Sequence, residues 1–191
     1  METKQLKQFV FEGMLVKDAL RQLSESGINI DVVSEKTVVE RAEQMDFPQR
    51  IISEAGRMAS IFVVFFSVEN SARELITQRL SERHGLSWWD MKVPQKVREH
   101  VVKLKASEQI HRYHTPRSSE QIGYTTFGQL EQIIIACWDD FSDLFPNQAW
   151  VSSRFKDMEM SRNIIMHTGI LAPFEVERLE MIARDWIRQT G

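Results

Sequence analysis

The stretch 61–80, which reads IFVVFFSVENSARELITQRL, decides the fold of this chain. Its apolar residues recur at intervals of three and four, which is the spacing of one face of an α-helix. The residues with this spacing are Ile61, Phe65, Val68, Ala72, Leu75, Ile76 and Leu80, and Gly85 follows as a suitable end. The pattern predicts one long helix whose first half is apolar on nearly every side, so we expect that half to lie centrally among neighbouring helices.

Two further helices are predicted on the C-terminal side of this stretch. Thr126 and Gln129 have the spacing of a capping box, in which two side chains satisfy free N–H groups of the first turn. They open a strong helix that runs to Leu144. After a connector at residues 147–153, helical spacing returns and ends at Gly169.

The last helix begins at Pro173, because proline suits the first turn of a helix. The residues of its buried face are Val176, Leu179, Ile182, Ala183 and Trp186. The sequence therefore predicts an all-α fold, an antiparallel helical bundle of four to five main helices, in a domain that spans residues 57–191.

Residues 1–56 form an N-terminal extension of uncertain role. In this extension residues 15–23 have helical spacing, residues 28–33 suit a short strand or a connector, and residues 38–45 have helical composition.

The composition is that of a soluble globular protein with one core. The chain has 191 residues, a formal charge of −3, 42% apolar and 27% charged residues, which excludes a disordered chain. The single cysteine, Cys137, lies in an apolar run, so we expect a buried thiol and a reducing compartment.

The apolar run 61–66 is far shorter than the roughly 20 residues that span a bilayer. Because the N-terminus also lacks a secretory pattern, we expect a cytoplasmic protein that does not bind membranes.

The stretch 161–169, SRNIIMHTG, places reactive residue types at the end of a predicted helix. Asn163 and His167 are four residues apart and share a face, and the long side chain of Arg162 reaches toward that face. A histidine exchanges a proton near neutral pH, and a guanidinium holds a phosphate with two parallel hydrogen bonds. Cleavage of RNA without a metal needs both groups. The same residues also suit a helix end that only caps or bridges helices.

Glu69, Asn70 and Arg73 lie within one turn of the long helix, next to its apolar run. We expect these residues to support the histidine motif, either within the site or as a salt bridge that fixes the motif helix.

Residues 92–117 carry seven basic residues against two acidic ones. The basic residues are Lys92, Lys96, Arg98, Lys103, Lys105, Arg112 and Arg117. Because neutralising phosphates supplies much of the affinity for nucleic acids, this segment is a candidate RNA-binding track, with a solvated surface as the alternative. His111 and His114 have a spacing that metal ligands use, but neither an acid nor a thiol accompanies them, and no metal site is predicted. We expect core positions for Trp88, Trp89, Trp138 and Trp186.

The stretch RNIIMH, residues 162–167, resembles the Arg-(Asn/Asp/His)-x3-5-His motif of the HEPN superfamily, the higher eukaryote and prokaryote nucleotide-binding domains. Three other stretches resemble, in the same order, the branch found at the C-terminus of a eukaryotic transcript-quality-control endoribonuclease. They are VENSARELI (68–76), HGLSWWDMKVP (84–94) and YTTFGQLEQIIIACWDDF (124–141). The resemblance covers residues 58–188.

The resemblance implies a homodimer in which two motif helices meet, and a metal-independent endoribonuclease without a cofactor. Its RNA products carry 2',3'-cyclic phosphate and 5'-hydroxyl ends. It implies that Arg162 binds phosphate, that Asn163 orients a histidine or the substrate, and that His167 transfers protons. Some relatives are toxins or phage-defence effectors restrained by an antitoxin or another regulatory protein. In toxins that a nucleotidyltransferase modifies, a tyrosine often follows the histidine by two residues, where this chain has Gly169. The alternative function is a catalytically silent helical adaptor that binds RNA or a protein partner.

Overall fold

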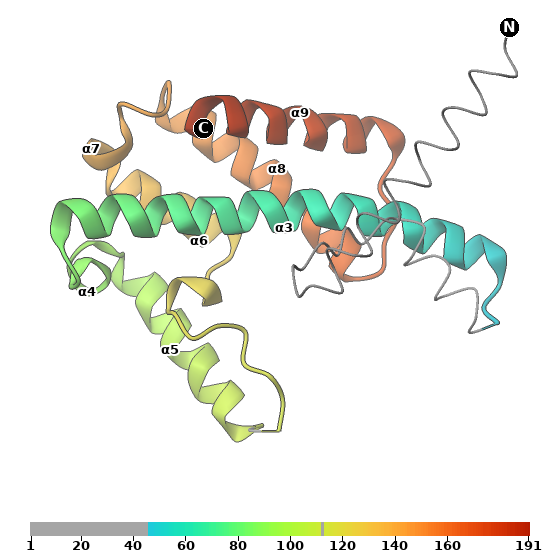
Figure 1. Cartoon of the computed structure of the whole chain (residues 1–191), viewed down its shortest axis with the longest axis horizontal. Coiled ribbons are helices and arrows are strands. Elements are labelled where there is room, and N and C mark those ends of the chain that lie inside the picture. The colour runs from blue at the N-terminus through green and yellow to red at the C-terminus, as the bar shows by residue number, and fades with distance from the viewer. Residues whose placement is uncertain (1–45, 112) are drawn as a thin grey trace, which may run out of the picture. The chain divides into compact units, whose positions relative to one another are not determined.

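The computed structural model describes residues 46–111 and 113–191, and Ser53–Gly191 form one compact unit. Within the described residues the secondary structure is helical and includes no strand, which confirms the all-α prediction. The elements are α3 (Gln49–His84), α4 (Trp88–Lys92), α5 (Gln95–Ile110), η1 (Ile122–Tyr124), α6 (Phe127–Ala136), α7 (Trp138–Phe141), α8 (Gln148–Met166) and α9 (Pro173–Thr190) (Figure 1). The features predicted for residues 15–23, 28–33 and 38–45 lie outside the described residues.

α3 is the long helix that the pattern of residues 61–80 predicts. Of its side chains that keep the helical spacing, Phe65, Val68, Ala72, Ile76 and Leu80 are buried in the core, and Leu75 is partly buried against it. The helix ends at His84 because Gly85 adopts a φ of 73°, a conformation that favours glycine. By length and composition α3 is also apolar enough to cross a membrane, with 33% of its most apolar window buried. Because one face of α3 forms part of the core, its apolar character is accounted for in part by packing.

The prediction of one continuous helix from Thr126 to Leu144 is wrong. The capping box at its start is present as predicted, but the chain leaves the helical conformation at Cys137, with φ −106° and ψ 33°. The break orients Asp140 so that its carboxylate lies 2.9 Å from Nε2 of His84 at the end of α3. The apolar spacing continues across the break because residues on both sides of it face the core, which is why the pattern did not show it.

The predicted connector at residues 147–153 is also wrong, because α8 begins at Gln148. Asn147 is extended, and its side-chain oxygen accepts the backbone N–H of Trp150 at 2.8 Å. This N-cap satisfies one of the free donors of the first turn and starts the helix earlier than its apolar residues indicate. α9 begins at Pro173, as predicted.

α8 and α9 are antiparallel neighbours. Two ion pairs join them, Arg154 with Asp185 at 2.6 Å and Asp157 with Arg178 at 4.0 Å. The later residue of α8 pairs with the earlier residue of α9, as antiparallel helices require. α9 runs beside α3 (Figure 1), and its Trp186 donates an indole N–H to Ser71 of α3 at 2.7 Å. This packing places the C-terminal half of α8 next to the middle of α3.

Aromatic rings fill the core where these helices meet. Phe145 stacks on Trp150 and Trp186 with ring centroids 5.7 and 5.6 Å apart, and Phe155 meets Trp186 at 5.5 Å. The core positions predicted for Trp88, Trp89, Trp186 and Cys137 are confirmed, and Trp138 is partly buried against the same core.

Candidate functional site

A polar network on α3 holds the start of α6. One terminal nitrogen of Arg73 donates to Oε1 of Glu69 and to the carbonyl oxygen of Thr125, each at 2.6 Å, and the other donates to Oδ1 of Asn70 at 2.9 Å. Asn70 in turn donates to the carbonyl oxygen of Phe66 at 2.8 Å. Glu69, Asn70 and Arg73, which the sequence singled out together, are therefore in direct contact and include a salt bridge.

Burial dominates the electrostatics of this network. It raises the pKa of Glu69 above the ordinary value of 4.5, although attraction to Arg73 and Arg162 opposes the shift. Burial also lowers the pKa of Arg73, against the attraction of Glu69. The side chains of Glu69 and Arg73 are only 11% and 17% exposed. The chain therefore keeps a charged pair in a place that is unfavourable for each charge alone.

Arg162 approaches this network from α8. Its Nε lies 3.9 Å from Oε2 of Glu69, the carboxylate oxygen that does not bond Arg73. The side chain of Arg162 is 33% exposed. Glu69 thus lies between two guanidiniums, one buried and one that reaches water.

Glu159, one turn before Arg162 on α8, is a member of this group that the sequence did not indicate. Its negative charge adds to the upward shift of the pKa of Glu69. Its carboxylate lies against Gly128 in the first turn of α6, where a side-chain carbon would come within 2.6 Å of Oε2. A glutamate in a helix next to a polar motif is too common in sequences to signal this contact.

His167 is the residue at which α8 ends. Its backbone N–H reaches the carbonyl oxygens of Asn163 and Ile164 at 3.2 and 3.3 Å, and its side chain is exposed, as is that of Asn163. Thr168 follows with a φ of 61°, a conformation that is rare for a β-branched residue. Within the part of the chain that the structure describes, no side-chain hydrogen bond or ion pair joins Arg162 to Asn163 or His167. The structure brings Arg162 together with Glu69 and leaves His167 facing solvent.

The basic residues of the segment 92–117 are spread over several surroundings. Two of them form ion pairs, Lys92 with Asp140 and Arg117 with Glu108. Arg98 donates to the carbonyl oxygen of Val93, and Lys105 lies over the ring of Tyr124. Arg112 lies outside the described residues. Lys96 and Lys103 are exposed on one side of α5, with the exposed His100 between them. These two lysines are therefore the part of the predicted track whose charge is exposed and not paired within the described residues.

Asp140 is the centre of a second charged cluster, which the sequence did not indicate. Its carboxylate lies 2.9 Å from Nε2 of His84, 3.4 Å from Arg83 and 3.6 Å from Nζ of Lys92. Burial raises the pKa of Asp140, but the hydrogen bond from His84 and the attraction of the neighbouring cations outweigh burial and hold the pKa below its ordinary value of 3.8. Two of the stretches that carry the HEPN resemblance, 84–94 and 124–141, thus meet at a buried carboxylate whose charge the fold favours.

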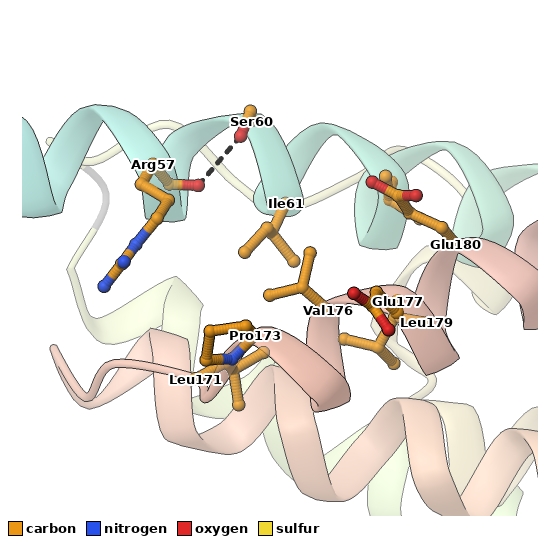
Figure 2. A pocket seen from close by; sticks show the side chains of 10 residues that line it. Arg57, Ser60, Ile61, Leu171, Pro173, Val176, Glu177, Leu179 and Glu180 are labelled. Carbon is orange, nitrogen blue, oxygen red and sulfur yellow. Dashed lines mark hydrogen bonds between the residues drawn. The ribbon is translucent and has the colours of Figure 1, made fainter.

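An apolar groove of about 330 Å³ lies between α3 and α9 (Figure 2). Its floor is formed by Ile61, Val64, Leu171, Val176 and Leu179, with Arg57 at one end and Glu177 and Glu180 at the other. No histidine or cysteine lines this groove. It therefore offers a surface for packing and no proton-transfer chemistry of the kind that the motif of α8 suggests.

His111 and His114 are exposed, and each ring lies beside that of Tyr113, at 5.9 and 4.5 Å respectively. In residues 46–111 and 113–191 no group of three or more His, Cys, Asp or Glu side chains is arranged to hold a metal ion.

Comparison of the chain with known protein families, with curated proteins and with solved structures finds no match. The HEPN resemblance therefore stays a prediction that rests on residues 162–167 and the three stretches in their order.

Proposed function

We propose that this protein is a homodimeric, metal-independent endoribonuclease of the HEPN type. The observation that carries the proposal is the position of Arg162, which Glu69 holds at 3.9 Å while a third of its side chain reaches solvent, on the helix that ends at His167. In the proposed reaction a 2'-hydroxyl attacks the adjacent phosphorus and the bond to the 5'-oxygen breaks. The products are a 2',3'-cyclic phosphate and a 5'-hydroxyl.

Arg162 binds the reacting phosphate in this proposal. Its Nε faces Glu69, so its two terminal nitrogens remain to donate a pair of hydrogen bonds to phosphate oxygens. These donors stabilise the extra negative charge that develops on the phosphate oxygens in the transition state. Because Glu69 fixes one edge of the guanidinium, Arg162 is oriented before the RNA arrives.

His167 transfers the protons, and two copies of it are needed. One histidine takes the proton of the 2'-hydroxyl while a second gives a proton to the leaving 5'-oxygen, and the two roles alternate if the groove is symmetric. A single chain supplies one His167, so we expect the second from a partner chain in which the two motif helices meet. Asn163, on the same side of α8 one turn earlier, orients a histidine or the substrate.

Exposed apolar side chains near the motif support the homodimer. On α8 they are Met160, Ile164 and Met166, at 59%, 40% and 50% exposed, and on α3 they are Phe62, Val63 and Phe66, at 42%, 62% and 59%. Exposed apolar side chains are the kind of surface that association sites on soluble proteins bury. We expect Phe66→Asp to yield monomers in analytical ultracentrifugation and to reduce cleavage with them.

The test is cleavage of a labelled single-stranded RNA in the presence of a chelator. We expect the native protein to produce cyclic-phosphate ends and His167→Ala to be slower by roughly 10²–10⁴-fold, since it lacks the proton-transfer group. Arg162→Ala should lose a comparable factor. Arg188→Ala, which removes an exposed basic residue of α9 outside the motif and outside the segment 92–117, is the control and should cleave at the native rate. Equal cleavage by the native protein and His167→Ala would contradict the proposal.

The adaptor function remains the alternative, because Arg162 paired with Glu69 would serve it equally well. RNA binding that His167→Ala leaves intact, with no cleavage by the native protein, would favour it. Failure to bind RNA at low salt would leave a protein partner.

A cytoplasmic toxin or phage-defence effector is the cellular role that fits a nuclease of this kind, with an antitoxin or regulator that restrains it. Growth arrest on expression that Arg162→Ala abolishes would support this role.

A further inference from the structure

A polar pocket of about 530 Å³ lies between α3 and the loop that leads into η1. From α3 it is lined by Asn70, Arg73, Glu74 and Thr77, and from the loop by Ser118 and Glu120 among others. Arg73 belongs to both this pocket and the network around Glu69, whose other oxygen faces Arg162. Glu69 therefore links Arg73, which lines the pocket, to Arg162, the guanidinium proposed to bind the reacting phosphate.

Both walls of the pocket are fixed in the folded chain. Glu108, near the end of α5, accepts the phenol O–H of Tyr124 at 2.9 Å and pairs with Nε of Arg117 at 2.8 Å. Arg117 precedes the loop that lines the pocket, and Tyr124 follows it. These hydrogen bonds outweigh the effect of burial and lower the pKa of Glu108. Arg73 donates to the carbonyl oxygen of Thr125 and so ties the same loop to α3. A ligand thus meets a preformed site.

The chemistry of the lining excludes a phosphate and favours N–H donors. Arg73 is its only cation, and both of its terminal nitrogens already bond Glu69, Asn70 or Thr125. The lining also includes Glu74 and Glu120, both exposed. With Arg73 these two carboxylates give the lining a formal charge of −1, and each of them accepts hydrogen bonds. A carboxylate accepts two adjacent N–H groups at once, as it does from the planar edge of a guanidinium.

Two buried polar atoms next to the pocket have no hydrogen-bond partner in the described residues. They are Nε of Arg73 and Oγ1 of Thr77, four residues apart on the same face of α3. Most buried polar atoms in folded proteins are paired, so the wall of the pocket on α3 keeps unused hydrogen-bonding capacity just beneath its surface.

The size of the pocket suits one nucleotide and excludes a duplex. Ligand sites for small molecules have volumes of about 300–1,000 Å³. Proteins that read RNA sequence do so mostly on single strands, whose unstacked bases form hydrogen bonds through their Watson–Crick edges. Among the four RNA bases, guanine alone presents two adjacent donor groups, N1–H and N2–H, on that edge.

We infer that this pocket binds one unstacked base of single-stranded RNA and selects guanine, whose paired N–H groups donate to Glu74 or Glu120. The inference rests on the proposed function, since it makes the pocket the base-reading part of the same RNA site. Because Glu69 contacts both Arg73, which lines the pocket, and Arg162, we expect a guanine held here to belong to the strand that reaches Arg162. Cleavage is then directed to bonds close to a guanosine.

Binding to oligonucleotides that cannot be cleaved tests this inference. The probes are fluorescein-labelled 2'-O-methyl RNAs of sequence UUGUU and UUUUU, which lack the attacking hydroxyl, and the readout is fluorescence anisotropy. We expect UUGUU to bind about 10-fold more tightly, within the range that one base contact contributes. Glu74→Gln/Glu120→Gln should abolish this preference. Both residues are exposed, so the double variant should fold normally, which circular dichroism checks.

Two controls separate this inference from the proposed nuclease. Glu99→Gln removes an exposed carboxylate of α5 outside the pocket and should keep the preference for UUGUU. His167→Ala should also keep it, because the ring does not line the pocket. Equal binding of the two oligonucleotides by the native protein, or a preference that the double variant retains, overturns the inference even if RNA is cleaved. A preference for UUGUU without any cleavage leaves the pocket assignment intact and contradicts the nuclease.

Discussion

Replacement of Asp140 by asparagine tests whether the charged cluster at the end of α3 is an element of stability. Asparagine keeps the shape of the side chain and removes its charge. Asp140 is 8% exposed, and its carboxylate faces His84, Arg83 and Lys92 at 2.9, 3.4 and 3.6 Å. Asp140→Asn therefore leaves three basic side chains without the carboxylate around which they gather.

The magnitude follows from the exposure of each partner. The hydrogen bond with His84, whose side chain is 24% exposed, belongs to the charged class that contributes about 1.5–3 kcal/mol. The side chains of Arg83 and Lys92 are 42% and 34% exposed, so each adds no more than the roughly 0–1 kcal/mol of a surface pair. We expect Asp140→Asn to lower the free energy of unfolding by about 2 kcal/mol. In a chain of this size that corresponds to a melting temperature lower by about 4–8 °C.

The assay is urea unfolding, followed by tryptophan fluorescence and circular dichroism, at several pH values. Because the pKa of Asp140 is lowered in the folded state, its stabilising effect is complete above the ordinary value of 3.8 and is lost as the pH falls through the lowered pKa. The free energy of unfolding of the native protein should exceed that of Asp140→Asn at neutral pH. This difference should shrink toward zero in that acidic range. Asp139→Asn, at the exposed neighbouring position, should stay within about 0.5 kcal/mol of the native protein. A difference for Asp140→Asn below about 0.5 kcal/mol at pH 7, or one that does not depend on pH, would refute the reasoning.

Two further predictions concern the motif itself. Glu69→Gln should lower the free energy of unfolding by about 3 kcal/mol at pH 7, because it leaves the buried guanidinium of Arg73 without its carboxylate. The same variant should cleave RNA at least about 10-fold more slowly, since Arg162 loses the carboxylate that orients it; loss of stability without loss of cleavage would contradict this. Thr168→Gly should raise stability by about 1 kcal/mol in thermal unfolding, because a φ of 61° costs a residue with a side chain roughly 1–2 kcal/mol and costs glycine little. Lower stability would mean that the hydrogen bond from Oγ1 to the carbonyl oxygen of His167 outweighs this strain.

The helices with local start or stop signals were predictable from the sequence. The capping box of Thr126 and Gln129, the proline at position 173 and the glycine at position 85 each act within a few residues of their own position, so their effect is visible in the sequence. The break at Cys137 was not predictable, because the apolar spacing continues across it and the contact of Asp140 with His84 joins distant parts of the chain.

The basic segment shows the same limit for the surface. A run of charge in the sequence carries no information on which side of a helix each residue lies. α5 turns about 100° per residue, which separates the exposed Lys96 and Lys103 from Arg98 and Lys105, whose side chains bond or cover neighbouring groups. The contact of Arg162 with Glu69 likewise depends on the packing of α8 against α3, although both residues stood out in the sequence.

Glu69 and Asp140, the two buried carboxylates among the described residues, differ in what their charge does for the fold. Both lie among cations, yet the pKa of Asp140 is lowered and that of Glu69 is raised. A charge that the fold favours contributes to stability, whereas a charge held against its desolvation has to be retained for another reason. For Glu69 that reason is found at its two oxygens, one of which bonds the buried Arg73 and the other of which faces the partly exposed Arg162. If a phosphate binds Arg162 as proposed, Glu69 keeps Arg73 as its counter-ion, and no buried charge of the network is left unpaired.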